Sequence, residues 1–216
     1  MTRPPQGPGD KPRQGLRTWL ESRLGWSEGF RRRYLERQVP AIVGWPQYFH
    51  RCLGGLCLLL LMMQLVSGLF LLLHYRPEPG QALASLMRME SQVWGGWALR
   101  RAHAVGGNLL LWGVSLHMLR VLWRGAYKDP RELHWLSGVV LWLVSLVMLF
   151  SGGLLPGTQA AWQALAGLCQ ALGMAPPGAQ NLGLAYGLHL GLPWLMLLAL
   201  WAHLAMVRCS GVAEPL

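Results

Sequence analysis

Charged residues are scarce in this sequence and absent from three long stretches. Only 13% of the 216 residues are Asp, Glu, Lys or Arg, whereas 53% are hydrophobic. No charged side chain occurs within residues 52–75, 102–119 or 133–207. A water-soluble globule of this length needs more charge to cover its surface. The composition therefore excludes that class and predicts an integral membrane protein.

Cysteine is also rare. The four cysteines, Cys52, Cys57, Cys169 and Cys209, form neither a paired-cysteine zinc pattern nor the Cys-x-x-Cys-His signature of ordinary covalent haem attachment. They predict no disulfide. Residues 1–17 are rich in proline, glycine and arginine and lack the apolar core of a secretory signal, so we expect a disordered N-terminal extension there.

Four hydrophobic blocks are each long enough to cross a membrane as a helix. The blocks cover residues 53–74, 98–123, 135–155 and 184–207. The predicted fold class is all-α, a four-helix transmembrane bundle. Ahead of the first block, apolar residues recur among arginines over residues 16–39, which predicts an amphipathic helix that lies on the membrane surface.

The connections between the blocks differ in length. Prolines and a glycine at residues 77–80 interrupt the first connection, and a Lys-Asp-Pro turn at residues 128–130 interrupts the second, so we expect loops in both. The third connection, residues 152–183, is the longest. Its apolar stretch at residues 158–172 predicts a short helix along the outer membrane face, and a loop of this length is usually functional.

The net charge of +10 is distributed unevenly along the chain. Ten of the nineteen basic residues precede residue 53, four more lie at residues 120–131, and none lies at residues 156–183. This is the positive-inside pattern of multi-pass membrane proteins, and the arginine run at residues 31–33 suits attraction to membrane lipid. We therefore expect a protein of the bacterial inner membrane with a cytoplasmic N-terminus, and no nucleic-acid partner.

Two of the blocks each contain a pair of histidines with the same spacing. His103 and His117 lie fourteen residues apart in the second block, and His189 and His203 lie fourteen apart in the fourth. Fourteen helical residues turn roughly 40° short of four full turns and rise about 21 Å. Both histidines of a block therefore face the same direction at two depths of the membrane.

Ionisable side chains within a membrane are costly and are usually functional. If the second and fourth blocks face each other, His103 and His189 form an outer pair, and His117 and His203 form an inner pair. Each pair can bind one iron from opposite sides, which predicts two bis-histidine haem b sites. A buried histidine that is hydrogen-bonded to a neighbouring helix is the alternative, and we keep it for the other three histidines.

Glycines in the first and third blocks repeat this spacing. Gly54 and Gly68 are fourteen residues apart, as are Gly138 and Gly152. A glycine in a helix costs about 1 kcal/mol relative to alanine, so a regular placement needs a reason. We interpret the four glycines as haem contacts, because a missing Cβ lets a flat group approach the backbone. Close helix packing through small residues is the alternative.

Two arginines accompany the histidines of the second block. Arg100 precedes His103 by three residues, and Arg120 follows His117 by three, so each lies toward a membrane boundary. Haem propionates are anionic and require cationic partners. Both arginines are therefore candidate propionate partners, and helix-end arginines that extend to the membrane surface are the alternative.

With these motifs the chain resembles the N-terminal, di-haem part of the cytochrome b family, and in particular the short form called cytochrome b6. The resemblance covers residues 19–215. It is carried by Cys-Leu-Gly-Gly at residues 52–55, the stretch 64–68, Tyr-Arg-Pro at 75–77, Arg-x-x-His at 100–103, His-x-x-Arg at 117–120, Lys-Asp-Pro-Arg-Glu-Leu at 128–133, Leu-Pro at 155–156 and the stretch 203–208.

This resemblance implies that residues 18–216 form a cytochrome b6-like haem-binding domain, with one haem on the outer histidine pair and one on the inner pair. It also implies a third haem, attached through Cys52 by a single thioether near the inner haem, and a basic residue of that region in Arg208. The alternative for Cys52 is a buried cysteine that packs as a small hydrophobic residue.

The resemblance further implies a subunit of a quinol:cytochrome c oxidoreductase of the cytochrome bc or b6f type. In such a complex one electron of a quinol passes to an iron-sulfur protein, and the other crosses from the outer haem to the inner one and reaches a quinone. The Pro-Glu-Trp-Tyr motif of longer relatives is absent from the sequence. We therefore expect a second cytochrome b subunit with the remaining helices, besides a Rieske-type iron-sulfur protein and a c-type cytochrome, in a dimeric complex.

Two other functions were weighed against this one. A di-haem cytochrome b that anchors a hydrogenase or dehydrogenase follows other histidine spacings and lacks the matched glycines. A haem-free transporter or scaffold requires the two equal histidine spacings to be coincidental.

Overall fold

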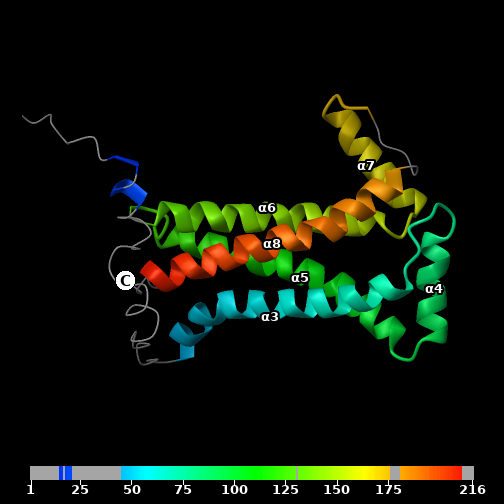
Figure 1. The fold of residues 1–216 in the computed structure, drawn as a ribbon, viewed down its shortest axis with the longest axis horizontal. Helices are drawn as coiled ribbons and strands as arrows, with labels where there is room; N and C mark the ends of the chain where they lie inside the picture. The colour runs from blue at the N-terminus through cyan, green and yellow to red at the C-terminus, as the bar shows by residue number, and fades with distance from the viewer. Residues whose placement is uncertain (1–14, 17, 21–44, 130, 176–180, 211–216) are drawn as a thin grey trace, which may run out of the picture.

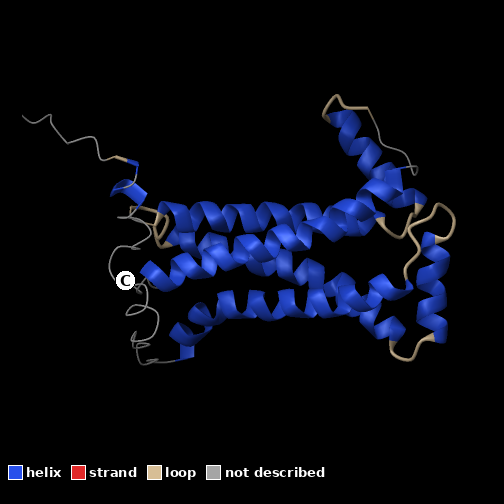
Figure 2. Cartoon of the chain, in the orientation of Figure 1, coloured by secondary structure: helices blue, strands red, loops and turns tan. Residues whose placement is uncertain are grey.

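The computed structural model describes residues 15, 16, 18–20, 45–129, 131–175 and 181–210. Figure 2 shows that this part of the chain consists of helices joined by loops, which confirms the all-α prediction. In chain order the helices are α3 (Trp45–His74), α4 (Ala82–Gln92), α5 (Gly96–Trp123), α6 (Glu132–Leu154), α7 (Gln159–Ala171) and α8 (Leu182–Ser210).

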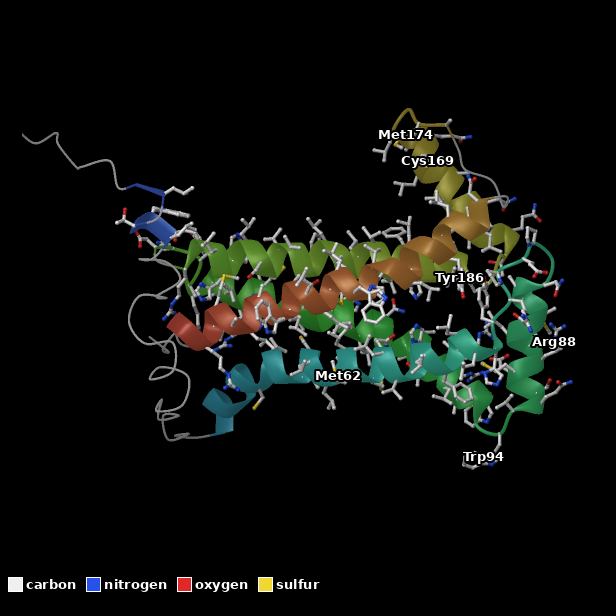
Figure 3. All side chains as sticks on the ribbon, in the orientation of Figure 1. Met62, Arg88, Trp94, Cys169, Met174 and Tyr186 are labelled. Atoms are coloured by element: carbon white, nitrogen blue, oxygen red, sulfur yellow. The ribbon has the colours of Figure 1, made fainter. Side chains whose placement is uncertain are left out.

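Four of these helices are long and apolar enough to cross a membrane, and they run side by side along the long axis of the molecule (Figure 1). Their apolar side chains point outward from the bundle, as Met62 does on α3 (Figure 3). So continuous an apolar surface is unfavourable in water and suits lipid. The predicted four-span bundle is confirmed. The spans within the described residues are Cys52–His74, Gly96–Trp123, Glu132–Leu154 and Leu182–Arg208.

Exposed tryptophans mark both ends of the bundle. The side chain of Trp94, just before α5, is 98% exposed and points away from the molecule (Figure 3). Trp123, at the other end of α5, is 87% exposed. Tryptophan is enriched where a membrane meets water, so these two residues are consistent with the two boundaries of the bilayer.

The connection between α3 and α5 contains helix α4, which lies across the end of the bundle (Figure 1). The expectation of a loop in this connection was wrong for residues 82–92. The proline-rich turn at residues 77–80 ends before the helix begins, and the following alanine, leucine and methionine residues favour helix. One face of α4 is buried through Ala82, Leu86 and Met89. Packing of this face against the bundle therefore stabilises the helix in addition to its intrinsic helix propensity.

The short helix predicted in the longest connection is present as α7, near the same end of the bundle as α4 (Figure 1). Trp162 anchors α7, because its side chain is only 7% exposed and packs in a core with Tyr75 and Leu182. Of the surface helix predicted at residues 16–39, only residues 16 and 18–20 are described, and these are helical. The rest of that helix and nearly all of the extension at residues 1–17 lie outside the described residues.

The helices pack in two close pairs, α3 on α5 and α6 on α8, and α5 also contacts α6. A buried cluster takes one side chain from each spanning helix: Leu61, Leu110, Val144 and Met196. Leu110 and Met196 each lie seven residues from both histidines of their helix. The cluster therefore forms an apolar layer midway between the outer and inner histidine levels.

Candidate functional site

The outer histidines meet between α5 and α8. The ring centroids of His103 and His189 are 6.2 Å apart, with an interplanar angle of 75°, although α5 and α8 are not among the closely packed helix pairs of the described chain. A metal–imidazole bond is about 2 Å long, so two imidazoles on opposite sides of one metal ion have facing nitrogens about 4 Å apart and ring centres further apart. The observed separation is compatible with one shared metal ion.

The inner histidines lie on the same two helices at the opposite end of the bundle. His117 and His203 are close enough to interact electrostatically, and His134 of α6 is a third histidine beside His203. The structure thus brings together both histidine pairs that the spacing predicted. It adds His134, for which no special role was predicted, to the inner level.

Each of the four regularly spaced glycines lies against one of the four histidines. The helix pairs α3–α5 and α6–α8 produce this arrangement, because each joins a glycine helix to a histidine helix. A Cβ atom added to each glycine would approach the Cε1 atom of one imidazole. These distances are 3.6 Å for Gly54 and His117, 3.0 Å for Gly68 and His103, 3.9 Å for Gly138 and His203, and 2.8 Å for Gly152 and His189.

Ser67 lies beside the imidazole of His103. The hydroxyl of Ser67 donates to the carbonyl oxygen of Met63, at 2.6 Å. The same oxygen lies 2.9 Å from Nδ1 of His103 and accepts a hydrogen bond when that nitrogen carries the proton. This leaves Nε2 with a free lone pair, which is the form of histidine that binds metal.

The same inference holds at His203. The hydroxyl of Ser137 donates to the carbonyl oxygen of His134 at 2.8 Å and lies 2.7 Å from Nδ1 of His203. With the proton on Nδ1, His203 donates to this oxygen, and Nε2 again keeps a free lone pair.

At His189 a carbonyl group fixes the tautomer. The Nδ1 atom lies 3.1 Å from the carbonyl oxygen of Met148, which can only accept, and 3.1 Å from the Oγ atom of Ser151. Nδ1–H is again the donor. Three of the four imidazoles thus have an acceptor at Nδ1, and the carbonyl oxygen of Met148 holds His189 in the metal-binding tautomer.

These serines were not among the predicted site residues, although the sequence carries a signal for them. A serine directly precedes three of the four spaced glycines, at residues 67–68, 137–138 and 151–152. At the fourth position Leu53 precedes Gly54. Correspondingly, Nδ1 of His117 is buried and has no hydrogen-bond partner in the described part of the chain.

The inner level has unused hydrogen-bonding capacity. Both ring nitrogens of His134, like Nδ1 of His117, are buried without a partner among the described residues. Buried polar atoms without partners are costly. The donor set, the free Nε2 atoms and the two unpartnered nitrogens of His134 therefore fit a metalloporphyrin with polar groups at its edge, bound between α5 and α8.

The predicted basic partners lie toward the ends of the spans. Arg100 forms an ion pair with Glu90 of α4 at 2.7 Å. Arg120 lies close enough to His117 to interact with it electrostatically, and Arg208 is in the last turn of α8. Cys52 is exposed at the inner end of α3 and forms no disulfide among the described cysteines.

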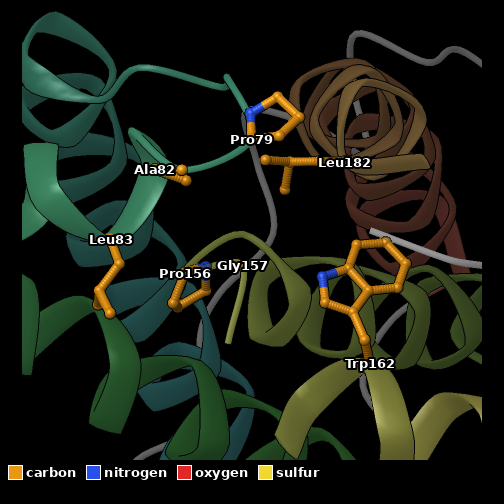
Figure 4. Close-up of a pocket in the computed structure, with 8 residues that line it drawn as sticks. Pro79, Ala82, Leu83, Pro156, Gly157, Trp162 and Leu182 are labelled. Carbon is orange, nitrogen blue, oxygen red and sulfur yellow. The ribbon is translucent and has the colours of Figure 1, made fainter. Parts of the chain in front are cut away.

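A small cavity of about 90 Å³ lies at the outer end, between α4, the start of α7 and the start of α8 (Figure 4). Its wall includes Pro79, Pro156, Leu182 and Trp162, and the indole nitrogen of Trp162 has no partner among the described residues. Sites for drug-sized ligands are about 300–1,000 Å³. This cavity is therefore too small for a quinol and has room for a few water molecules.

Comparisons with known proteins identify the family of the chain. Residues 43–182 match the family model described as Cytochrome b/b6/petB. The cytochrome b6 of Heliobacterium mobile is 36% identical over 214 residues, which cover 92% of this chain and 99% of that protein. The menaquinol:cytochrome c reductase cytochrome b subunit of Geobacillus thermodenitrificans is 31% identical. The match covers 93% of this chain and 98% of that protein. Among solved structures, a chain of a hyperthermophilic respiratory Complex III has a TM-score of 0.72 and 28% identity over 91% of this chain and 56% of its own length.

Proposed function

The chain belongs to the cytochrome b/b6 family, and on this premise we propose that it carries electrons across a membrane through two haem b groups. It is an integral membrane subunit of a quinol:cytochrome c oxidoreductase type of complex. His103 and His189 bind the outer iron in this proposal, and His117 and His203 bind the inner one. Haem, when bound, supplies reversible one-electron chemistry.

The observation that carries the proposal is the geometry of the histidines. His103 and His189 face each other with ring centroids 6.2 Å apart. Three imidazoles have Nδ1 within hydrogen-bond distance of a serine or a carbonyl group of the neighbouring helix. Hydrogen bonds of this kind orient metal-binding histidines and raise their basicity. They also hold the rings in place before the cofactor arrives.

The rest of the chain separates and insulates the two sites. The apolar layer around Leu110 and Met196 excludes water between the two levels, and low dielectric surroundings strengthen the electrostatic influence of nearby groups. The spacing along α5 and α8 places the levels about 21 Å apart. In this proposal Arg100 and Arg120 serve as propionate partners at the outer and inner ends.

The proposed substrate is a quinol, which loses two electrons and two protons when it becomes a quinone. The small cavity near Trp162 does not accommodate it, so we propose that a second cytochrome b subunit completes the quinol site. The other proposed partners are a Rieske-type iron-sulfur protein and a c-type cytochrome in a dimeric complex. We place the complex in a bacterial inner membrane with the N-terminus in the cytoplasm.

We also propose that Cys52 holds a third haem near the inner level. The thiol is exposed, whereas Cys57 one turn further along α3 is partly buried and packs against Gly113. An exposed thiol two residues before Gly54, which lies against His117, is accessible to a cofactor. The Cys-Leu-Gly-Gly resemblance supports the same assignment.

The test of the two-haem proposal is the haem content of purified variants, measured by the pyridine haemochrome assay. Wild-type chain is expected to hold two extractable b haems. His189→Ala is expected to lose the outer haem, and His203→Ala the inner one, so each variant falls to one. His74→Ala is the matched control, because the hydrogen bond and the ring stacking of His74 are both made with Phe70 of its own helix. Wild-type protein without b haem would overturn the proposal.

A further inference from the structure

The four histidines are not equivalent in their hydrogen bonds. Nδ1 of His103, His189 and His203 lies within hydrogen-bond distance of an acceptor on the neighbouring helix. Nδ1 of His117 is buried, and no described residue accepts from it. The cause is visible in the sequence, because Leu53 occupies the position before the glycine where the other three sites have serine.

The outer and inner histidine pairs therefore differ in the number of histidines with a hydrogen-bond partner at Nδ1. Both outer histidines are anchored, His103 by Ser67 and His189 by Ser151 together with the carbonyl group of Met148. At the inner level only His203 is anchored, by Ser137.

The glycine contacts show the same division independently. At the outer level a Cβ on the facing glycine would lie 3.0 Å from His103 and 2.8 Å from His189. At the inner level the corresponding distances are 3.6 Å for His117 and 3.9 Å for His203. The outer imidazoles are thus seated more tightly against the neighbouring helices than the inner ones.

The hydrogen bond at Nδ1 affects the metal through the ring. An imidazole that donates Nδ1–H becomes a stronger base at Nε2. A more basic ligand stabilises the oxidised iron more than the reduced iron and therefore lowers the reduction potential. Two anchored ligands at the outer level and one at the inner level bias a shared electron toward the inner level.

We propose that Ser67, Ser137 and Ser151 are positioning residues for three haem ligands, and that Leu53, by leaving His117 without such a partner, favours reduction of the inner haem over the outer one. This inference rests on the two-haem function proposed above. The transfer it concerns moves one electron from the reduced outer iron to the oxidised inner iron, with no bond made or broken and no proton transferred. Its effect is a downhill step from the outer to the inner level.

The direct test is the variant Leu53→Ser, with Leu53→Ala as the control that shortens the side chain without adding a hydroxyl group. A hydroxyl at position 53 can donate to the carbonyl group of Phe49, four residues earlier in α3, and accept from Nδ1–H of His117. Redox titration of the two α-bands in the purified complex measures both potentials. Leu53→Ser is expected to lower the equilibrium constant for outer-to-inner transfer about tenfold, which is about 59 mV for a one-electron couple. Leu53→Ala is expected to keep the wild-type value.

The reciprocal test is made at the outer level. Ser67→Ala removes the side-chain acceptor for His103 and is expected to raise the reduction potential of the outer haem, again narrowing the difference between the two haems. Ser67→Thr keeps a hydroxyl group and is expected to restore the wild-type potential. A serine that served only helix packing would not give this pattern.

The outcomes separate this inference from the function on which it rests. A preparation with fewer than two b haems contradicts the proposed function before any potential is measured. The positioning role alone is overturned if Leu53→Ser and Leu53→Ala both hold two haems and have the same pair of reduction potentials. It is also overturned if the reduction potential of the outer haem is unchanged in Ser67→Ala. If Leu53→Ser does not assemble, the Ser67 variants decide the question by themselves.

Discussion

A Cβ atom on Gly152 would lie only 2.8 Å from the Cε1 atom of His189, whereas a Cβ on the neighbouring Gly153 would meet nothing within 4 Å. The two glycines share one helix and one type of backbone, but only one of them faces an imidazole. This relationship ties the glycine of α6 directly to the geometry of the outer histidine pair.

Gly152→Ala is expected to displace the imidazole of His189 and weaken the outer haem site, so that haem content falls from two per chain toward one. Alanine in a helix is otherwise about 1 kcal/mol better than glycine, so a loss would be a local effect of the contact. Gly153→Ala is the matched control and is expected to keep both haems. The pyridine haemochrome assay and the α-band spectrum measure the difference, and equal haem content in the two variants contradicts the prediction.

Tyr75 predicts a pH dependence of stability at the outer end. Its hydroxyl donates to the carbonyl oxygen of Leu155 at 2.6 Å. Burial, with a further contribution from the charge of Tyr186, raises the pKa of Tyr75 to about 12. Because the folded pKa lies above the unfolded value of about 10, the stabilising effect is complete below about pH 10 and is lost as the pH rises to about 12.

Tyr75→Phe is expected to lower the free energy of unfolding by about 1 kcal/mol near neutral pH, since the Leu155 carbonyl loses its donor. The difference between wild type and variant should shrink between about pH 10 and 12. Thermal unfolding in detergent, followed by circular dichroism at several pH values, measures it. A difference that stays constant up to pH 12 contradicts the assignment.

Substitutions in the Arg100–Glu90 ion pair distinguish whether Arg100 is a propionate partner or a helix-end arginine that extends to the membrane surface. Both side chains are about 30% exposed, so the pair itself contributes at most about 1 kcal/mol. Glu90→Gln is therefore expected to change the melting temperature by about 2–4 °C at most and to leave the outer haem in place. Arg100→Gln is expected to weaken outer haem retention during dialysis, because a cation for the propionates is lost. Equal haem retention in both variants favours the helix-end role.

Cys52 is tested by haem that stays on the denatured chain. Wild type and the control Cys57→Ser are expected to show haem peroxidase staining after denaturing electrophoresis, and Cys52→Ser is expected to lose it. Staining that persists in Cys52→Ser contradicts attachment at this thiol. A wild-type chain without staining favours the alternative that Cys52 only packs as a small hydrophobic residue.

The sequence predicted the spanning helices closely, and the reason is physical. Long runs without charge have no stable place except in lipid, and in lipid the backbone must satisfy its own hydrogen bonds as helix. The histidine pairing was also predictable, since two equal spacings of fourteen residues on rigid helices fix the relative heights and directions of the rings. Helix α4 was missed because its formation depends on burying Ala82, Leu86 and Met89 against the bundle.

By itself, the sequence determined four spans, two levels of paired histidines and the family resemblance. It did so because helical periodicity and the cost of charge in lipid act along the chain, residue by residue. Only the tertiary structure decided which helix packs on which, and hence that each spaced glycine faces one imidazole. It also decided that Ser67, Ser137 and Ser151 accept from Nδ1–H while His117 has no such partner among the described residues. Contacts between helices depend on how side chains far apart in the sequence pack together, and local sequence patterns do not predict this packing.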